Sequence, residues 1–457
     1  MFDFAAYIDR ELARFHDELE AFLRIPSIST DPERAGDIRA CADWVAGHLL
    51  AAGMHEAEVI ETGGHPIVVG ERIHSEEAPT VLVYGHYDVQ PSEPDELWTS
   101  PPFEPEVRDG RLYARGSIDD KGQVHMHIKA LEARLASGAE IPVNLKLVIE
   151  GEEEVGSRHL AAFLHEHAAR LACDAILVSD TGMFSPELPC ITTGLRGIVY
   201  TEINVHGPRS DLHSGTYGGA VVNPANALAA ILAGLRDEHG RATVPGYYDA
   251  VRPISRRERA DLERLPMDEE TLRTGVGAPA LGGEAGFSAL ERVWYRPTLD
   301  VNGLLSGFTG EGSKTVLPSR AMAKVSMRLV PNQDPTQVIE AFEARVHELA
   351  PEGVRVEIKR SHGGAPWAAD TEHPIFDAAS AALESGFGTP PAFVREGGSI
   401  PIVQEFEETF GAPALLIGFA LPGSNMHAPD EWIDLGVYRK GIAALADLYG
   451  RLVDPLP

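Results

Sequence analysis

Apolar positions in the first part of the chain follow two different spacings. In some segments apolar side chains recur every three or four residues, which predicts amphipathic helices. In others they form short continuous runs, which predict buried strands. Strands that alternate with helices indicate an α/β fold, in which helices cover a sheet. The predicted helices span 3–24, 37–52 and 121–135, and the predicted strands span 80–84, 143–149 and 175–179.

The pattern changes near Gly194. Strict alternation of apolar and polar residues then predicts strands of a half-exposed sheet, with a charge-rich helical segment between them. These strands cover 197–206, part of 314–330 and 354–359, and the charge-rich segment covers 251–274. Near Trp367 the pattern returns to helices and buried strands. We therefore predict a discontinuous α/β domain, residues 1–195 and 369–457, interrupted by an inserted α+β domain, residues 196–368.

Charge and composition narrow the class of protein. The 457 residues carry a formal net charge of −30 at pH 7, which disfavours binding to nucleic acid or to anionic membranes. No apolar run approaches the roughly 18 residues of a membrane span. The N-terminal segment carries early acidic residues instead of the basic and then apolar regions of a signal peptide, so we expect a cytoplasmic protein. Cys41, Cys173 and Cys190 have no CxxC spacing and are expected to be reduced.

Residues that can bind cations follow the predicted strands or lie in glycine-flanked loops. Taken singly, each has an ordinary structural explanation, such as a hydrogen-bonded turn, a helix N-terminus or a solvated acidic loop. Taken together, imidazoles mixed with carboxylates suit zinc or manganese. Two such ions held roughly 3.5 to 4 Å apart by a shared carboxylate form a hydrolytic centre. The candidate residues are His86, Asp88, Asp119, Glu153, Glu154, Asp180 and His427.

Five strings, in order, resemble the dinuclear M20 metallopeptidases: GHYDV, GSIDDKG, EGEEEVGS, LVSD and NMHAPDE. Further strings resemble the branch that includes carnosinase and the cytosolic nonspecific dipeptidases: DLHSG at 211–215, SKTVLPSRAMAKVSMRLVP at 313–331, SHGGAPW at 361–367 and REGGSIP at 395–401. The resemblance covers nearly the whole chain. It implies a zinc-peptidase-like catalytic domain, with a mixed sheet flanked by helices, for 1–195 and 369–457. It implies a lid and dimerisation domain for 196–368.

The resemblance implies two bound divalent metal ions. Zinc is the expected metal, and manganese and cobalt accept the same ligand types. Glu153 would act as general base on a water that bridges the metals, and Asp88 would hold the imidazole of His86. The implied ligands are His86 and Asp180 at one metal, Glu154 and His427 at the other, and Asp119 at both.

The implied reaction is metal-dependent hydrolysis of an amide bond in dipeptides or similar small peptides. An N-acyl amino acid deacylase, of the acetylornithine deacetylase or succinyl-diaminopimelate desuccinylase type, remains the alternative. The resemblance also implies a homodimer in which the loop around His213 reaches the partner's active site and its imidazole stabilises the oxyanion. Arg328 can grip a terminal carboxylate through two parallel hydrogen bonds. The implied substrate contacts are His213, Thr315, Arg328, His362 and Ser399.

Overall fold

The computed structural model describes residues 4–398, 400–454 and 456. Its contacts divide the chain into two compact units. The first unit comprises Met1–Thr193, Ala369–Val394 and Ile402–Pro457, and the second comprises Gly194–Ala368 and Arg395–Pro401. The division places the short segment Arg395–Pro401 with the inserted residues, which the sequence pattern did not indicate. Within the described residues, no helix combines the length and apolar character needed to cross a membrane.

A mixed sheet forms the centre of the first unit. Its strands are β1 (Glu56–Ile60), β2 (Ile67–Arg72), β3 (Thr80–His86), β6 (Asn144–Glu150), β7 (Ala175–Val178), β8 (Cys190–Leu195), β16 (Ala392–Glu396) and β17 (Ala414–Leu416). The sheet also includes β15 (Trp367–Ala368), which belongs to the residues assigned to the second unit. They lie in the order β1-β2-β6-β3-β7-β17-β8-β15, and β16 also pairs with β8. β3 runs parallel to β6 and β7, and β17 runs parallel to β7. The pairs towards both sheet edges are antiparallel.

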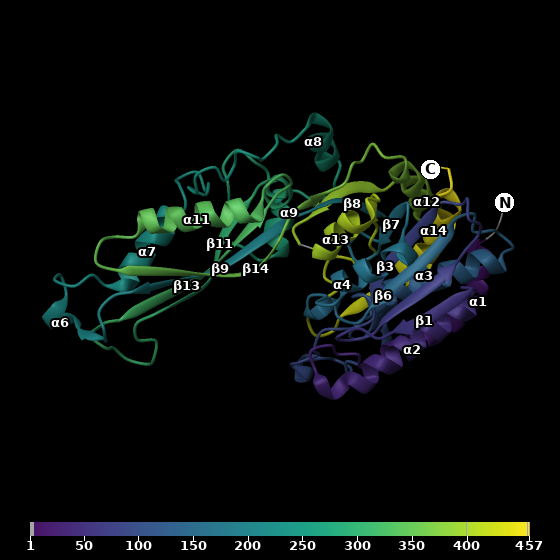
Figure 1. Cartoon of the computed structure of the whole chain (residues 1–457), viewed down its shortest axis with the longest axis horizontal. Helices are drawn as coiled ribbons and strands as arrows, with labels where there is room; N and C mark the ends of the chain where they lie inside the picture. The colour runs from purple at the N-terminus through teal and green to yellow at the C-terminus, as the bar shows by residue number, and fades with distance from the viewer. Residues whose placement is uncertain (1–3, 399, 455, 457) are drawn as a thin grey trace. The chain divides into compact units, whose positions relative to one another are not determined.

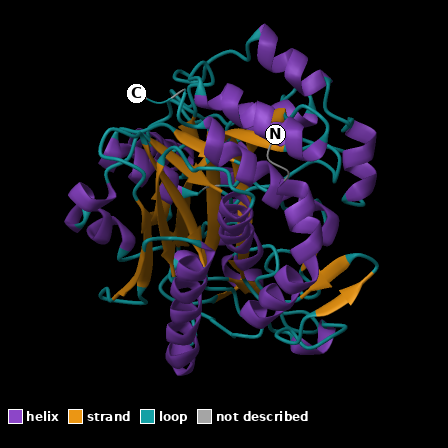
Figure 2. Ribbon diagram, turned by 90° about the vertical axis from the view of Figure 1, so that its right-hand side faces the viewer, coloured by secondary structure: helices purple, strands orange, loops and turns teal. Residues whose placement is uncertain are grey.

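Helices cover both faces of this sheet (Figure 2). The side chains of Val81 and Val83 belong to a core shared with five helices on one face. These are α1 (Phe4–Leu23), α2 (Ala35–Ala52), α3 (Lys121–Ala136), α12 (Ile375–Phe387) and α14 (Leu435–Arg451). On the other face, the ring of Tyr84 meets that of Phe406 in α13 (Pro401–Phe410), with centroids 5.2 Å apart. Alternate side chains of β3 therefore pack against helices on opposite faces of the sheet. Both sets are buried, which explains why the apolar pattern of β3 is continuous.

Each of the six elements predicted for the first part of the chain is present, with bounds that differ by at most two residues. The apolar stripe of α1 is buried, with Phe15, Leu19 and Phe22 fully enclosed. Helix α2 ends at Gly53, whose φ of 113° lies in the left-handed region that favours glycine. The three cysteines are free, as expected. The remaining short elements of the first unit are α4 (Leu160–Glu166), α5 (Ala168–Leu171), β4 (Glu106–Arg108), β5 (Arg111–Tyr113) and β18 (Trp432–Asp434).

The second unit is built on an antiparallel sheet of order β11-β13-β9-β14. The strands are β11 (Thr298–Ser306), β13 (Arg320–Leu329), β9 (Gly197–His206) and β14 (Arg355–Gly364). Two helices, α7 (Pro224–Gly234) and α11 (Pro335–Leu349), lie along one face of this sheet (Figure 1). Residues on β9 alternate between buried and half-buried, because only that face is covered. The alternating strands predicted from the sequence are confirmed.

The charge-rich segment 251–274, predicted to be helical, contains two helices. They are α8 (Arg256–Glu263) and α9 (Glu269–Gly275). Pro266 lies between them, and proline lacks the N–H that a helix interior requires. The side chain of Asp268 then accepts a hydrogen bond from the Thr271 N–H and begins the second helix. The other short elements of this unit are α6 (Ser214–Tyr217), α10 (Ala289–Tyr295), β10 (Leu212–His213) and β12 (Val316–Leu317).

Candidate metal centre

The residues predicted to bind metal lie at one edge of the sheet in the first unit. Strands β3, β6, β7 and β17 point the same way, so the loops after their carboxyl ends meet. His86 ends β3, Asp180 follows β7, and His427 lies in the loop after β17. Strand β6 leads into the short 3₁₀ helix η3 (Glu153–Val155), and Asp119 lies two residues before α3. Five segments that are distant in the sequence thus contribute to one site.

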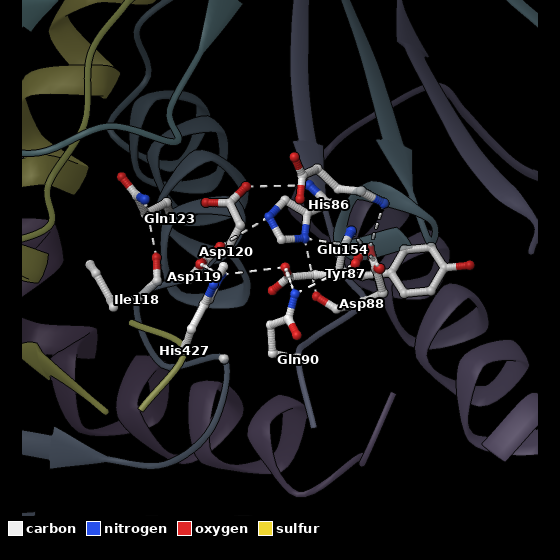
Figure 3. Close-up of polar contacts among 12 residues, drawn as sticks. His86, Tyr87, Asp88, Gln90, Ile118, Asp119, Asp120, Gln123, Glu154 and His427 are labelled. Atoms are coloured by element: carbon white, nitrogen blue, oxygen red, sulfur yellow. Dashed lines mark hydrogen bonds and ion pairs between the residues drawn. The ribbon is translucent and has the colours of Figure 1, made fainter. Parts of the chain in front are cut away.

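The carboxylate of Asp119 lies between two imidazoles (Figure 3). Its Oδ1 is 3.1 Å from Nε2 of His86, and its Oδ2 is 2.9 Å from Nε2 of His427. The same His427 nitrogen is 3.3 Å from Oε2 of Glu154. Two overlapping groups result, one of His86, Asp119 and Asp180 and the other of Asp119, Glu154 and His427. Within each group the potential ligand atoms lie within 4.8 Å of one another.

The charges in this cluster favour a cation. Burial, reinforced by neighbouring carboxylates, raises the pKa of Glu153 to about 7 and that of Asp180 well above its usual range. Hydrogen bonds to Asp119 and Glu154 raise the pKa of His427 to about 10. Buried carboxylates repel one another unless protons or cations neutralise them. An imidazole and carboxylate donor set with this repulsion fits two divalent ions, with Asp119 able to contact both.

Asp88 organises the residues next to the ligands. Its two carboxylate oxygens accept hydrogen bonds from the backbone N–H groups of Glu153 and Glu154, at 3.2 and 3.1 Å. Nδ1 of His86 lies 3.1 Å from the backbone oxygen of Asp88 and 3.4 Å from its Oδ1. Asp88 therefore contacts the ring of His86 and also fixes the start of η3. The hydrogen bonds from Asp88 to the start of η3 were not anticipated from the sequence.

Two residues near the cluster received no role from the sequence. The amide of Gln90 donates a hydrogen bond of 2.7 Å to Oε2 of Glu154. Glu431 is fully buried and accepts hydrogen bonds from the turn that ends at Asp119. Gln90 follows the string GHYDV and Glu431 ends the string NMHAPDE, but nothing in local spacing shows which hydrogen bonds their side chains make. Their partners are far away in the sequence, so only the folded chain reveals these contacts.

The predicted substrate contacts lie in the second unit. The His213 side chain is exposed, and its Nδ1 accepts a hydrogen bond from the N–H of Gly215. The backbone oxygen of Thr315 accepts a hydrogen bond from Ser214, the neighbour of His213. Arg328 is half-buried on β13. His362 is described only by its place in β14, and Ser399 lies outside the described residues.

These contacts form two groups at opposite ends of β9. At one end, Ile198 pairs with Arg328 on β13 and with Gly364 on β14, two residues after His362. At the other end, His206 pairs with Arg320, and the loops that carry His213 and Thr315 lie beyond it. Eight residues of extended strand separate Ile198 from His206, which is about 26 Å at about 3.3 Å per residue. One subunit therefore separates the predicted contacts into two sets.

An α/β unit with two overlapping groups of imidazole and carboxylate ligands defines a candidate dinuclear metalloprotein. Residues 82–451 match the model of peptidase family M20/M25/M40, and the chain belongs to this family. The Cys-Gly metallodipeptidase dug1 of Schizosaccharomyces pombe is 33% identical over 466 residues, which cover 98% of both chains. The family suggested by the sequence motifs is thus confirmed.

Solved structures of similar proteins share the fold. The crystal structure of human carnosine dipeptidase 1 matches with a TM-score of 0.81 and 29% identity, covering 99% of this chain and 98% of the other. An M20 family metallo-carboxypeptidase, Sso-CP2 from Sulfolobus solfataricus, matches with a TM-score of 0.82 and 31% identity over 95% of this chain and 98% of the other. These matches confirm the predicted fold class.

Proposed function

We propose that this chain is a metal-dependent dipeptidase that uses two divalent ions, with zinc as the native metal. The observation that carries the proposal is the position of Glu153. It lies beside the two ligand groups without belonging to either, and its pKa is raised to about 7. A carboxylate that is not a metal ligand remains available for proton transfer. The similar proteins named as dipeptidases support a small peptide as the substrate.

His86, Asp119, Glu154, Asp180 and His427 would hold the metals, which supply Lewis acidity that acidifies water and polarises a carbonyl. Glu153 would accept a proton from the attacking water and pass it to the nitrogen of the departing amine. The N–H bonds to Asp88 keep the backbone of Glu153 in place during this transfer. The ligand Glu154 cannot take this role freely, because metal binding requires it to remain an anion.

We further propose a homodimer whose active sites are each completed by the partner subunit. Arg328 and His362 would bind the substrate's carboxylate end, while His213 and Thr315 of the partner subunit would approach from the other side. The separation of these two sets along β9 supports this proposal. Strand β11, at the edge of the sheet, exposes the apolar side chains of Val301, Leu304 and Leu305, which a second copy would cover. The three free cysteines fit a reducing compartment, for which we propose the cytoplasm.

A substrate panel with controlled metal content tests the proposal. We expect hydrolysis of dipeptides such as Cys-Gly and β-alanyl-histidine to be lost after chelation and restored by Zn²⁺, Mn²⁺ or Co²⁺. Elemental analysis of the purified protein should give two metal ions per subunit. Faster hydrolysis of acetylated or succinylated amino acids would identify a deacylase instead, although the relatives named as dipeptidases do not favour that alternative. Stepwise release of C-terminal residues from longer peptides would identify a carboxypeptidase.

A further inference from the structure

Glu431 is the acceptor for a whole turn of the backbone. Its Oε1 accepts hydrogen bonds from the N–H groups of Ile118 and Asp119, at 3.0 and 3.1 Å. Its Oε2 accepts from the N–H of Gly116 at 2.9 Å and from Nη1 of Arg115 at 2.7 Å. The side chain is fully buried. A buried carboxylate with four donors, one of them a guanidinium, is held in a single position.

The loop around Glu431 is equally well defined. The two ends of this loop are joined by a backbone hydrogen bond, in which the N–H of Trp432 donates to the oxygen of Ser424 at 3.0 Å. Within the loop, Nδ2 of Asn425 donates to the backbone oxygen of Asp430 at 3.2 Å. His427 lies inside this closed loop, four residues before Glu431. The position of Glu431 therefore constrains the position of the His427 backbone.

We propose that Glu431 is a positioning residue that sets the distance between Asp119 and His427. It binds the backbone N–H of one ligand residue and lies in the closed loop of the other. These two residues, with Glu154, form the second group of candidate ligands. Correct ligand spacing raises metal affinity, and loss of a group that orients ligands typically costs 10- to 100-fold in affinity. The inference rests on the dinuclear site of the proposed function.

Substitution by glutamine separates geometry from charge. In Glu431→Gln one of the two oxygens becomes an NH₂ group, which cannot accept hydrogen bonds. Two of the four donors then lose their acceptor, although the side chain keeps its shape. Asp430→Asn is the matched control, because this neighbouring carboxylate accepts hydrogen bonds from Thr99 and Arg108, away from the Asp119 turn. Asp430 has no part in either ligand group.

Metal affinity is measured by calorimetric titration of the metal-free protein with Zn²⁺. We expect Glu431→Gln to weaken one of the two binding steps by about 10-fold or more, and to weaken the other step less, because Asp119 belongs to both groups and His427 to one. The weakened step should be binding to the second group, which contains His427. Binding to this group should disappear in His427→Ala and remain in Asp180→Asn. Asp430→Asn should bind both ions as the wild type does. Wild-type affinities for both ions in Glu431→Gln would overturn the proposal.

A second measurement needs neither activity nor a stable variant. In the metal-free wild-type protein, hydrogen exchange of the N–H groups of Gly116, Ile118 and Asp119 should be slow, because Glu431 accepts them. Rapid exchange there, with the flanking strands protected, would contradict the inference even if Glu431→Gln fails to fold. Failure of the proposed function would appear differently, as a wild-type protein that binds fewer than two ions or hydrolyses no dipeptide.

Discussion

Two adjacent glutamates at the end of β6 occupy different environments. Oε2 of Glu154 lies 3.3 Å from His427 and accepts a 2.7 Å hydrogen bond from Gln90, so this carboxylate points into the second ligand group. Glu153 stands outside both groups and has a pKa raised to about 7. Chemical identity alone cannot separate the two residues. Their roles as ligand and base are proposals that follow from these different neighbours.

Replacement of Glu153 by glutamine tests its role as base. Glu153→Gln keeps the shape of the side chain and removes its basicity. We expect kcat to fall by about 10² to 10⁴, the range that a positioned acid–base group supplies. Metal content, measured by elemental analysis, should stay near that of the wild type. Loss of metal in Glu153→Gln combined with retained metal in Glu154→Gln would show that the two roles are reversed.

The sequence indicated the candidate ligands but not the residues that hold them. His86, Asp119 and His427 are of metal-binding type and lie in recognisable strings, so the sequence alone is sufficient to select them. Glu431 ends one of these strings, but the string does not reveal its role, because its hydrogen-bond donors lie more than 300 positions away, beginning at Arg115. A buried acceptor and an exposed acidic residue look alike in one sequence. Long-range hydrogen bonds are therefore the part of the site that sequence reasoning misses.

At the scale of elements, a glycine turn packs against the segment that carries Glu153. Glu152, the residue before it, forms an ion pair of 2.7 Å with His159. A Cβ atom at Gly64 would lie 2.0 Å from Oε1 of Glu152 and 2.6 Å from Nδ1 of His159. Both atoms are at the ends of side chains, so an added Cβ would have to push these side chains aside.

Substitution of that glycine should therefore cost stability. We expect Gly64→Ala to displace the Glu152–His159 pair and to lower the free energy of unfolding by up to about 1 kcal/mol, the contribution of one hydrogen bond, because side-chain ends can move away from the added Cβ. Gly47→Ala is the control, because this exposed glycine in α2 has no atom within 4 Å of its added Cβ. There alanine should stabilise by roughly 0.5 to 1 kcal/mol. Urea unfolding measures the free energy of unfolding of both variants. Equal changes in the two variants would show that the close approach at Gly64 does not affect stability.

Elements with a clear period were the ones that the sequence predicted well. The apolar stripe of α1 and the alternation along β9 each follow from one covered face, so local pattern and tertiary structure agree. The segment 251–274 was predicted to be charge-rich and helical without bounds for its helices, and Pro266 lies between the two helices that form there. The grouping of Arg395–Pro401 with the second unit depends on contacts such as that of Arg196 N–H with the Gly398 oxygen at 3.1 Å, which no local pattern encodes.

At the scale of the whole molecule, the second unit raises the question of which subunit supplies each group. Arg328 pairs with Ile198 near one end of β9 and His213 lies beyond the other end, at His206, so about 26 Å or more separates them at about 3.3 Å per residue. A dipeptide is far shorter than that distance. If both residues contact one substrate, they must come from different copies of the chain. A symmetric dimer would bring them together twice, once at each active site.

Mixing two inactive variants tests this arrangement. His213→Ala and Glu153→Gln should each have little activity alone, because one lacks the oxyanion donor and the other lacks the base. After subunit exchange, half of the dimers are mixed, and each mixed dimer has one site with both groups intact. Activity should then return to about a quarter of the wild-type value in a symmetric dimer. If His213 instead acted in its own subunit, no mixed dimer would contain an intact site.

A second mixture distinguishes the two cases independently. The double variant is exchanged with an equal amount of wild type. About a quarter of full activity should remain if His213 acts on the partner, and about half if it acts in its own subunit.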